Sequence, residues 1–236
     1  MTWVIDNLDV IGRLLVAHLY LALPPIVASL VLAIPIAWLA TKVRWLREPI
    51  VGGASLMYAI PSLPLFIVLP LVLGTGIRDP INAIVALTLY GLALMVPATV
   101  DALRQVNPQV IDAAVAVGHP PLRRFLTVEL PLAGPVMLSG LRVVAVSTIS
   151  LVTVASVLGL QSLGSLFVDG FQRGITEEII TGLVVTAALA LLVDWLLGRA
   201  GRLVLPWTRA NAGQQVAQQT AQRTAQQTAQ PSGGQA

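Results

Sequence analysis

Five long apolar runs alternate with shorter polar segments along the chain. A helix needs about 20 apolar residues to cross the hydrocarbon core of a bilayer, and each run reaches that length. The runs therefore predict five transmembrane helices, at residues 14–40, 50–73, 81–100, 132–160 and 179–198. Prolines interrupt the first three runs, which predicts kinks because proline removes a backbone hydrogen bond. In the second run, the pattern also allows the first turns to lie along the membrane interface.

Composition agrees with a membrane protein and narrows the possible chemistry. Of the 236 residues, 56% are hydrophobic and only 11% are charged, whereas soluble domains are about 25% charged. Cysteine is absent, which excludes disulfides, thiolate catalysis and cysteine-bound metals. His18 and His119 are the only histidines, so we expect no metal site and no enzymatic activity. The expected fold class is all-α integral membrane protein, with one membrane domain at residues 14–200.

The charged residues separate into two groups on alternate sides of the predicted spans. Short loops rich in Lys and Arg stay on the cytoplasmic side. One side takes most of the basic residues: Lys42, Arg44, Arg47, Arg104, Arg123, Arg124, Arg199, Arg202, Arg209 and Arg223. The other takes Arg13, Arg78 and Arg173, with Asp6, Asp9, Asp79, Asp169, Glu177 and Glu178. We expect a protein of the cell membrane with an extracytoplasmic segment 1–13 and a cytoplasmic C-terminus. The tail 201–236 is rich in Gln, Ala and Thr, which predicts disorder or a weak solvated helix.

A polar segment at residues 107–135 separates the third and fourth runs. It predicts a short Ala-rich helix at 110–117, with Asp112 in the first turn at the positive end of the helix dipole. Gly118 can end that helix in a left-handed conformation, and Pro120-Pro121 cannot continue it. A second short helix at 122–130 then leads to a break at Leu130-Pro131. A helix–turn–helix between two membrane-length segments indicates a docking element, because a plain connection is shorter.

The same segment resembles the cytoplasmic loop of ATP-binding-cassette importer permeases, whose pattern is E-A-A, three residues, G, nine residues, I-x-L-P. Asp112-Ala113-Ala114 is followed after three residues by Gly118, and after nine more by Val128-Glu129-Leu130-Pro131. Asp112 and Val128 are mild departures from Glu and Ile. The resemblance implies that residues 112–123 form a coupling helix that sits in a cleft of an ATPase subunit. The implied coupling residues are Asp112, Ala113, Ala114, Gly118, His119, Pro120, Pro121, Leu122, Arg123, Leu130 and Pro131.

Further short motifs resemble the permeases for glycine betaine, choline and related osmoprotectants. They are His18-Leu19, Ile60-Pro61-Ser62-Leu63, Ala86-Leu87-Thr88-Leu89-Tyr90, Gly140-Leu141-Arg142 and the turn from Leu158-Gly159 to Gly164. In that family the last turn is usually richer in glycine, so this departure bears on loop geometry and substrate choice. The resemblance implies the type I importer fold and import of an osmoprotectant.

The resemblance also implies the partners of the chain. They are an ATPase subunit, a second permease subunit that is an identical copy or a paralogue, an extracytoplasmic substrate-binding protein and the lipid bilayer, with no nucleic acid. No G-x-x-x-x-G-K-[ST] motif occurs in the chain, so ATP would bind to the partner ATPase and this chain would bind no cofactor.

Other functions remain open from the sequence. A methionine or other amino-acid permease has the same loop and number of spans. A secondary transporter or channel that works alone would be expected to show an internal repeat or mid-membrane acids. We find no repeat, and the second to fourth spans contain no mid-membrane acid. A membrane enzyme lacks any nucleophile–base pair or metal set.

A few single residues are candidates for the transport pathway. Arg142 is a charge inside an apolar run, although it lies close enough to the cytoplasmic side to snorkel. Tyr58 and Tyr90 can make cation–π contacts with a quaternary ammonium, although aromatic residues at membrane interfaces are also common. We expect Asp194 to be an interfacial cap and His18 to be a polar residue near the outer membrane edge.

Overall fold

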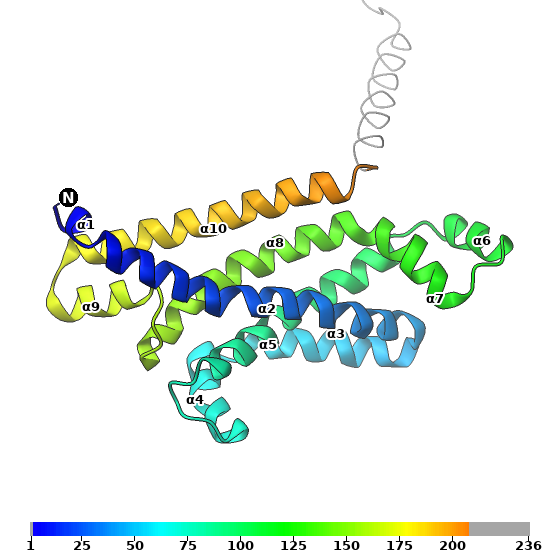
Figure 1. Cartoon of the computed structure of the whole chain (residues 1–236). Helices are drawn as coiled ribbons and strands as arrows, with labels where there is room; N and C mark the ends of the chain where they lie inside the picture. Colours follow the sequence, from blue (N-terminus) through cyan, green and yellow to red (C-terminus); the bar gives the residue numbers. More distant parts are fainter. Residues whose placement is uncertain (1, 208–236) are drawn as a thin grey trace, which may run out of the picture.

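The computed structural model describes residues 2–207, and every regular element in that range is a helix. Four helices are long and apolar enough to cross a bilayer. They are α2 (Leu8–Lys42), α5 (Pro80–Arg104), a continuous helix over Pro121–Leu158 whose main part is α8 (Leu130–Ala155), and α10 (Thr176–Val204). Figure 1 shows them running along the length of the molecule. The predicted Gln-rich tail lies outside the described residues.

The second predicted span is a bent pair of helices instead of one helix. α3 (Arg44–Ala59) and α4 (Ser62–Leu73) meet at an angle of 106°. Ile60 and Pro61 between them are extended, because a residue before proline disfavours the helical conformation. Counting this pair as one span gives the five spans that the apolar runs predict. The prediction of one kinked helix at 50–73 was therefore wrong, because the helix stops before Pro61 and a second helix begins after it.

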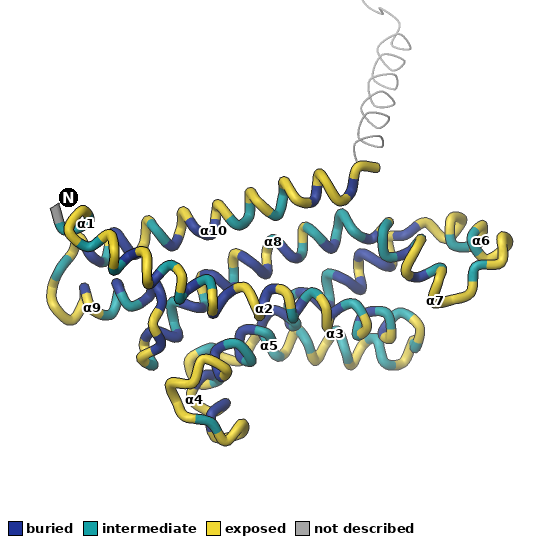
Figure 2. Tube along the Cα trace, viewed as in Figure 1, coloured by how far each residue is buried: buried dark blue, intermediate teal, exposed yellow. Residues whose placement is uncertain are grey.

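Small side chains set the close packing of α2 against α5. Ala33 and Ala37 of α2 are completely buried. Where α5 passes α2, a Cβ added to Gly91 would lie 2.7 Å from Ser29 Cβ, so only glycine allows this approach. Helices in membranes pack through such small residues, because apolar surface gains little by leaving lipid. α5 in turn packs on α8, and α8 on α10, so α5 and α8 form the centre of the bundle, and both carry buried residues along their length (Figure 2).

Several helices are longer than the apolar runs indicate. α2 begins at Leu8 and α10 continues to Val204, so the predicted boundaries at residues 13 and 200 fall inside helices. An apolar run marks only the part of a helix that lies in the hydrocarbon core of the bilayer. The helix itself can continue into the polar interface, because its backbone hydrogen bonds are internal. Asp9 lies in the first turn of α2 and Lys42 in its last turn, and Glu177 and Arg202 hold the same places in α10. The molecule thus has an acidic end and a basic end.

The acidic end carries two short helices, α1 (Thr2–Asp6) and α9 (Ser165–Arg173). α9 lies between the fourth and fifth predicted spans, where the sequence predicted no helix. It buries Leu166 and packs against α10 at Gly170, where an added Cβ would lie 2.8 Å from Ile179 Cγ1. The basic end carries α6 (Pro108–Ala116) and α7 (Pro121–Arg124).

Candidate coupling site

The two short helices α6 and α7 project from the basic end of the bundle (Figure 1). Asn107 begins α6: its side-chain oxygen accepts a hydrogen bond from the Gln109 backbone N–H at 2.9 Å, and Pro108 follows in the first turn. This combination is a strong helix start, because the side chain satisfies a free N–H and proline has none to satisfy.

Gly118 ends α6 in the left-handed conformation that the sequence predicts, with φ of +85°. Its N–H bonds to the carbonyl of Val115 at 2.9 Å, and the His119 N–H bonds to that of Ala114 at 3.1 Å. These two bonds form a Schellman motif, which satisfies the last carbonyls of the helix. No atom lies within 4 Å of an added Cβ at Gly118, so glycine is required by the backbone angle and not by space.

Asp112 does not lie in the first turn of α6, which contains no acidic residue. The helix begins at Pro108, two residues before the predicted start, because Asn107 caps it. The expected interaction of Asp112 with the positive end of the helix dipole is therefore wrong. Asp112 and Ala113 are exposed, whereas Ala114 is half-buried, so the acid lies on the solvent-facing side of the projecting helix.

The surface of this loop is unusually apolar for its exposure. Val115, Val117 and Leu122 are 51%, 79% and 60% exposed, and Figure 2 shows α6 and α7 as largely exposed. Exposed apolar groups that cluster on a projecting element are typical of a protein–protein contact. Pro120, Pro121 and Arg123 are exposed as well. Most of the predicted loop residues are thus exposed on the projecting segment, whereas Ala114 and His119 are half-buried and Leu130 and Pro131 lie at its base.

The predicted break at Leu130-Pro131 is absent. A π-helical segment (Phe125–Glu129) joins α7 to α8, and the Leu130 N–H bonds to the carbonyl of Phe125. Proline normally clashes with the carbonyl four residues earlier. One extra residue in this turn accommodates the ring of Pro131, so the helix continues through it. α7 is consequently joined to the membrane-spanning helix α8 by continuous helix.

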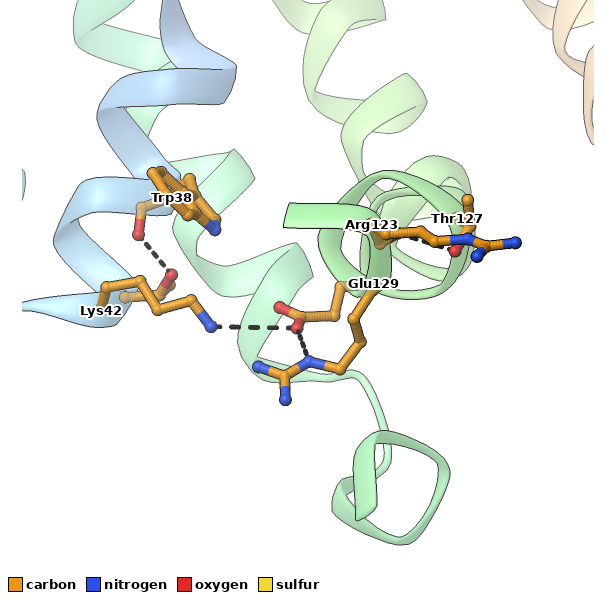
Figure 3. A network of polar contacts seen from close by, with 7 residues as sticks. Trp38, Lys42, Arg123, Thr127 and Glu129 are labelled. Atoms are coloured by element: carbon orange, nitrogen blue, oxygen red, sulfur yellow. Dashed lines mark hydrogen bonds and ion pairs between the residues drawn. The ribbon is translucent and has the colours of Figure 1, made fainter. Parts of the chain in front are cut away.

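A buried ion-pair network lies at this junction (Figure 3). Glu129 Oε1 accepts a hydrogen bond from Arg124 Nε at 2.8 Å and lies 3.9 Å from Lys42 Nζ at the end of α2. The Glu129 side chain is only 10% exposed. Beside it, the ring of Trp38 on α2 packs at 5.6 Å from that of Phe125. The network links the base of the loop to the end of the first spanning helix.

Sequence reasoning missed this network. Glu129 occupies the unspecified position of the I-x-L-P pattern, and Lys42 and Arg124 entered only as loop charges. In Figure 3 the predicted residue Arg123 points away from Glu129, and its backbone carbonyl accepts a bond from Thr127 Oγ1 at 2.7 Å. The sequence did contain a signal for this network. Glu129 is an acid flanked by apolar residues just before a membrane span, and a buried carboxylate requires a partner.

The three candidate pathway residues lie in two separate places. Tyr58 and Tyr90 form an edge-to-face pair with ring centres 6.1 Å apart, and the Tyr90 hydroxyl donates to the Ile60 carbonyl at 2.6 Å. That bond satisfies a carbonyl left free by the break between α3 and α4. Arg142 lies elsewhere, where Nε and Nη2 donate to the two carboxylate oxygens of Asp194 at 2.7 and 2.5 Å.

Two further expectations require correction. Asp194 is no interfacial cap, because it lies within α10 and forms a bidentate pair with Arg142 of α8. His18 is no interface residue, because it is completely buried. Its Nδ1 accepts a bond from the Leu163 N–H at 3.3 Å, so Nε2 carries the proton and donates to the Ile149 carbonyl at 3.1 Å. His18 thereby ties α2 to α8 and to the turn before α9.

His119 takes part in the loop mainly through its backbone. Its Nδ1 is buried and has no hydrogen-bond partner within residues 2–207. That same range contains no group of three or more His, Cys, Asp or Glu residues able to hold a metal ion.

A bundle of spanning helices with a helical loop projecting from one end is the architecture of a membrane permease. The chain belongs to the family of binding-protein-dependent transport system inner membrane components, whose pattern matches residues 33–209. This family confirms the resemblance of the chain to importer permeases and its location in a membrane. The chain is a transport component, as the sequence predicts.

Characterised relatives narrow the comparison. The osmoprotectant import permease protein OsmW of Salmonella typhimurium is 31% identical over 207 residues, which cover 86% of this chain and 96% of that protein. The choline transport system permease protein OpuBB of Bacillus subtilis is 29% identical over 189 residues, 80% of this chain and 86% of that protein. In structure, a chain of the inward-facing MetNI methionine transporter matches with a TM-score of 0.75 at 20% identity, covering 84% of this chain and 98% of that one. This likeness confirms the type I importer fold.

Proposed function

We propose that this chain is the membrane permease of an ATP-driven importer for osmoprotectants such as glycine betaine or choline. The observation that carries the proposal is the projecting loop, which combines the family spacing, the Gly118 turn and exposed apolar side chains. Similarity to the osmoprotectant permease OsmW over most of both chains supports the substrate class. Import of methionine or another amino acid is the alternative, since the MetNI chain has the same fold.

The projecting surface of α6 and α7 is the proposed docking site for a separate ATPase subunit, which binds the ATP. With a second permease subunit and an extracytoplasmic binding protein, the chain forms the importer. The basic end then faces the cytoplasm, in agreement with the positive-inside rule, and the acidic end faces the binding protein. ATP binding closes the ATPase pair, moves the coupling helices and changes which side of the pathway is open.

The structure offers a route for this movement. The continuous helix over Pro121–Leu158 carries a displacement of α7 directly into the membrane, and the Glu129 network carries it to α2. Tyr58 is 47% exposed beside the break at Ile60, which supports a place for Tyr58 on the pathway. Tyr90 is buried and donates its hydroxyl to the Ile60 carbonyl, which supports a structural role for Tyr90. The bidentate bond to Asp194 supports a structural role for Arg142, as a link between α8 and α10.

The test is reconstitution of the chain with its ATPase and binding protein in lipid vesicles, with ATP hydrolysis and uptake of labelled glycine betaine measured together. ATP-dependent uptake is the expected result. Uptake that needs no ATPase overturns the importer mechanism. Stimulated hydrolysis without betaine uptake keeps the class and moves the substrate to choline, other betaines and then methionine.

A further inference from the structure

A cavity of about 660 Å³ opens at the acidic end of the bundle. Its walls come from four places in the chain: the start of α2, the turn between α4 and α5, the turn after α8, and α9. Most of its lining is polar or backbone, and it contains charged side chains of both signs, Arg13, Arg78 and Asp169. A cavity of this size holds a small organic solute.

Arg78 differs from the other basic residues at this end because it has no partner. Arg13 pairs with Asp9 at 3.4 Å, and Arg173 pairs with Glu178 at 2.9 Å. Within residues 2–207, no hydrogen bond or ion pair involves the Arg78 side chain. Arg78 is solvent-exposed where it lines the cavity. A guanidinium without a protein partner can bind a carboxylate through two hydrogen bonds, because its planar fork matches that group.

The backbone at Gly159 makes room for this side chain. Gly159 has a φ of +85°, and a Cβ added there would lie 3.0 Å from Arg78 Nε and 3.5 Å from Cζ. The guanidinium therefore lies against Gly159, and a side chain at that position would reduce the space for it. The turn that holds Gly159 is the one that departs from the glycine-rich pattern of related permeases.

An opposite charge lines the same cavity from α9. Asp169 also has no hydrogen bond or ion pair among the described residues, and it lies beyond the 4.0 Å at which it would pair with Arg78. One cavity thus holds a cation and an anion that are separate and unpaired. This arrangement is complementary to a small molecule that carries both charges.

We infer that this cavity is a transit site for a zwitterionic solute, in which Arg78 binds the carboxylate and Asp169 faces the cationic nitrogen. The inference rests on the proposed function and deepens it, because it separates two kinds of osmoprotectant. Glycine betaine has both charges, whereas choline has a hydroxyl in place of the carboxylate. The site therefore favours glycine betaine over choline through Arg78.

The absence of cysteine from the chain allows a direct test. Gln161 lines the cavity, and the variant Gln161→Cys introduces a single thiol there. The full-length variant in lipid nanodiscs is labelled with a thiol-specific methanethiosulfonate, and the rate is measured with increasing glycine betaine or choline. We expect glycine betaine to slow labelling at a concentration about tenfold lower than choline, which corresponds to about 1.4 kcal/mol.

Further variants assign the preference to a residue. Arg78→Gln should remove the difference between the two solutes, and Arg78→Lys should retain part of it, since the charge remains without the fork. Asp169→Asn should weaken protection by both solutes. Arg13→Gln is the matched control: it removes a charge from the same cavity, but one already paired with Asp9, and should leave the difference unchanged.

Three results would overturn the inference. The first is that choline and glycine betaine slow labelling equally, and the second is that the Arg78→Gln variant keeps the preference for glycine betaine. The third is that labelling is slowed only when the binding protein is added. The last result would make the cavity a protein-docking surface. Labelling needs neither ATP nor transport, so its outcome is independent of the uptake assay. If glycine betaine is taken up but does not slow labelling, only the proposed transit site is refuted. If it slows labelling but is not taken up with ATP, only the proposed importer mechanism is refuted.

Discussion

The ion-pair network at the base of the loop leads to a quantitative prediction for Glu129→Gln. The side chains of Glu129 and Arg124 are 10% and 15% exposed, so the substitution leaves a nearly buried guanidinium without its counter-charge. Removal of one partner from a buried pair costs about 3–5 kcal/mol. Some water still reaches Arg124, so we expect the lower end of that range, about 3 kcal/mol.

Lys42 adds little to this value. Its Nζ lies 3.9 Å from Glu129 Oε1 and its side chain is 35% exposed, and pairs of that kind contribute about 0–1 kcal/mol. For a chain of this length, 1 kcal/mol shifts the melting temperature by about 2–4 °C. Glu129→Gln should therefore lower the melting temperature by about 6–12 °C, and Lys42→Met by only about 0–4 °C.

The assay is thermal unfolding of the purified chain in detergent, followed by tryptophan fluorescence. Glu48→Gln is the matched control, because Glu48 is 81% exposed in its pair with Arg47 and should contribute about 0–1 kcal/mol. The double variant Arg124→Met/Glu129→Met should recover most of the loss, since a buried pair can be replaced by apolar groups at little cost. The reasoning fails if Glu129→Gln destabilises the chain no more than Glu48→Gln.

Three further predictions test a turn and two hydrogen-bonded contacts elsewhere in the structure. Gly118→Val forces a β-branched residue into a left-handed turn and should uncouple ATP hydrolysis from uptake in the assembled complex. Gly174→Val introduces the same strain at the acidic end and should not uncouple them. Normal uptake by the Gly118→Val variant would count against the coupling role. His18→Leu leaves the buried backbone N–H of Leu163 without a hydrogen-bond partner and should cost about 1–3 kcal/mol in thermal unfolding. Tyr90→Phe releases the Ile60 carbonyl and should cost about 1 kcal/mol, with no change if water replaces the hydroxyl.

The two prolines at helix junctions show where prediction from sequence stops. Pro61 and Pro131 both follow an apolar residue near a predicted span, yet Pro61 ends a helix and Pro131 lies inside one. At Pro61 the break is stabilised by Tyr90, which bonds to the freed carbonyl of Ile60. At Pro131 a π-turn absorbs the ring, and Phe125 in that turn packs on Trp38 of α2. The partner that decides each outcome lies on another helix.

Single polar and charged residues show the same limit. His18 bonds to Ile149, 131 residues away, and Arg142 bonds to Asp194, 52 residues away. His18 and Asp194 were expected to lie near a membrane surface, because an unpaired polar group is costly in lipid. That expectation was wrong, since each of them has a partner that removes this cost.

The sequence by itself determined the properties that depend on neighbouring residues: the apolar runs, the alternation of charge between loops, and the left-handed end of α6 at Gly118. Each follows from local hydrophobicity or backbone sterics, which need no knowledge of the fold. Only the tertiary structure decided which polar groups are paired, as in the Glu129 network, and which are left without a partner, as at Arg78. Burial and pairing depend on how distant helices pack, and that arrangement sets the cost or gain of every charge within the bundle.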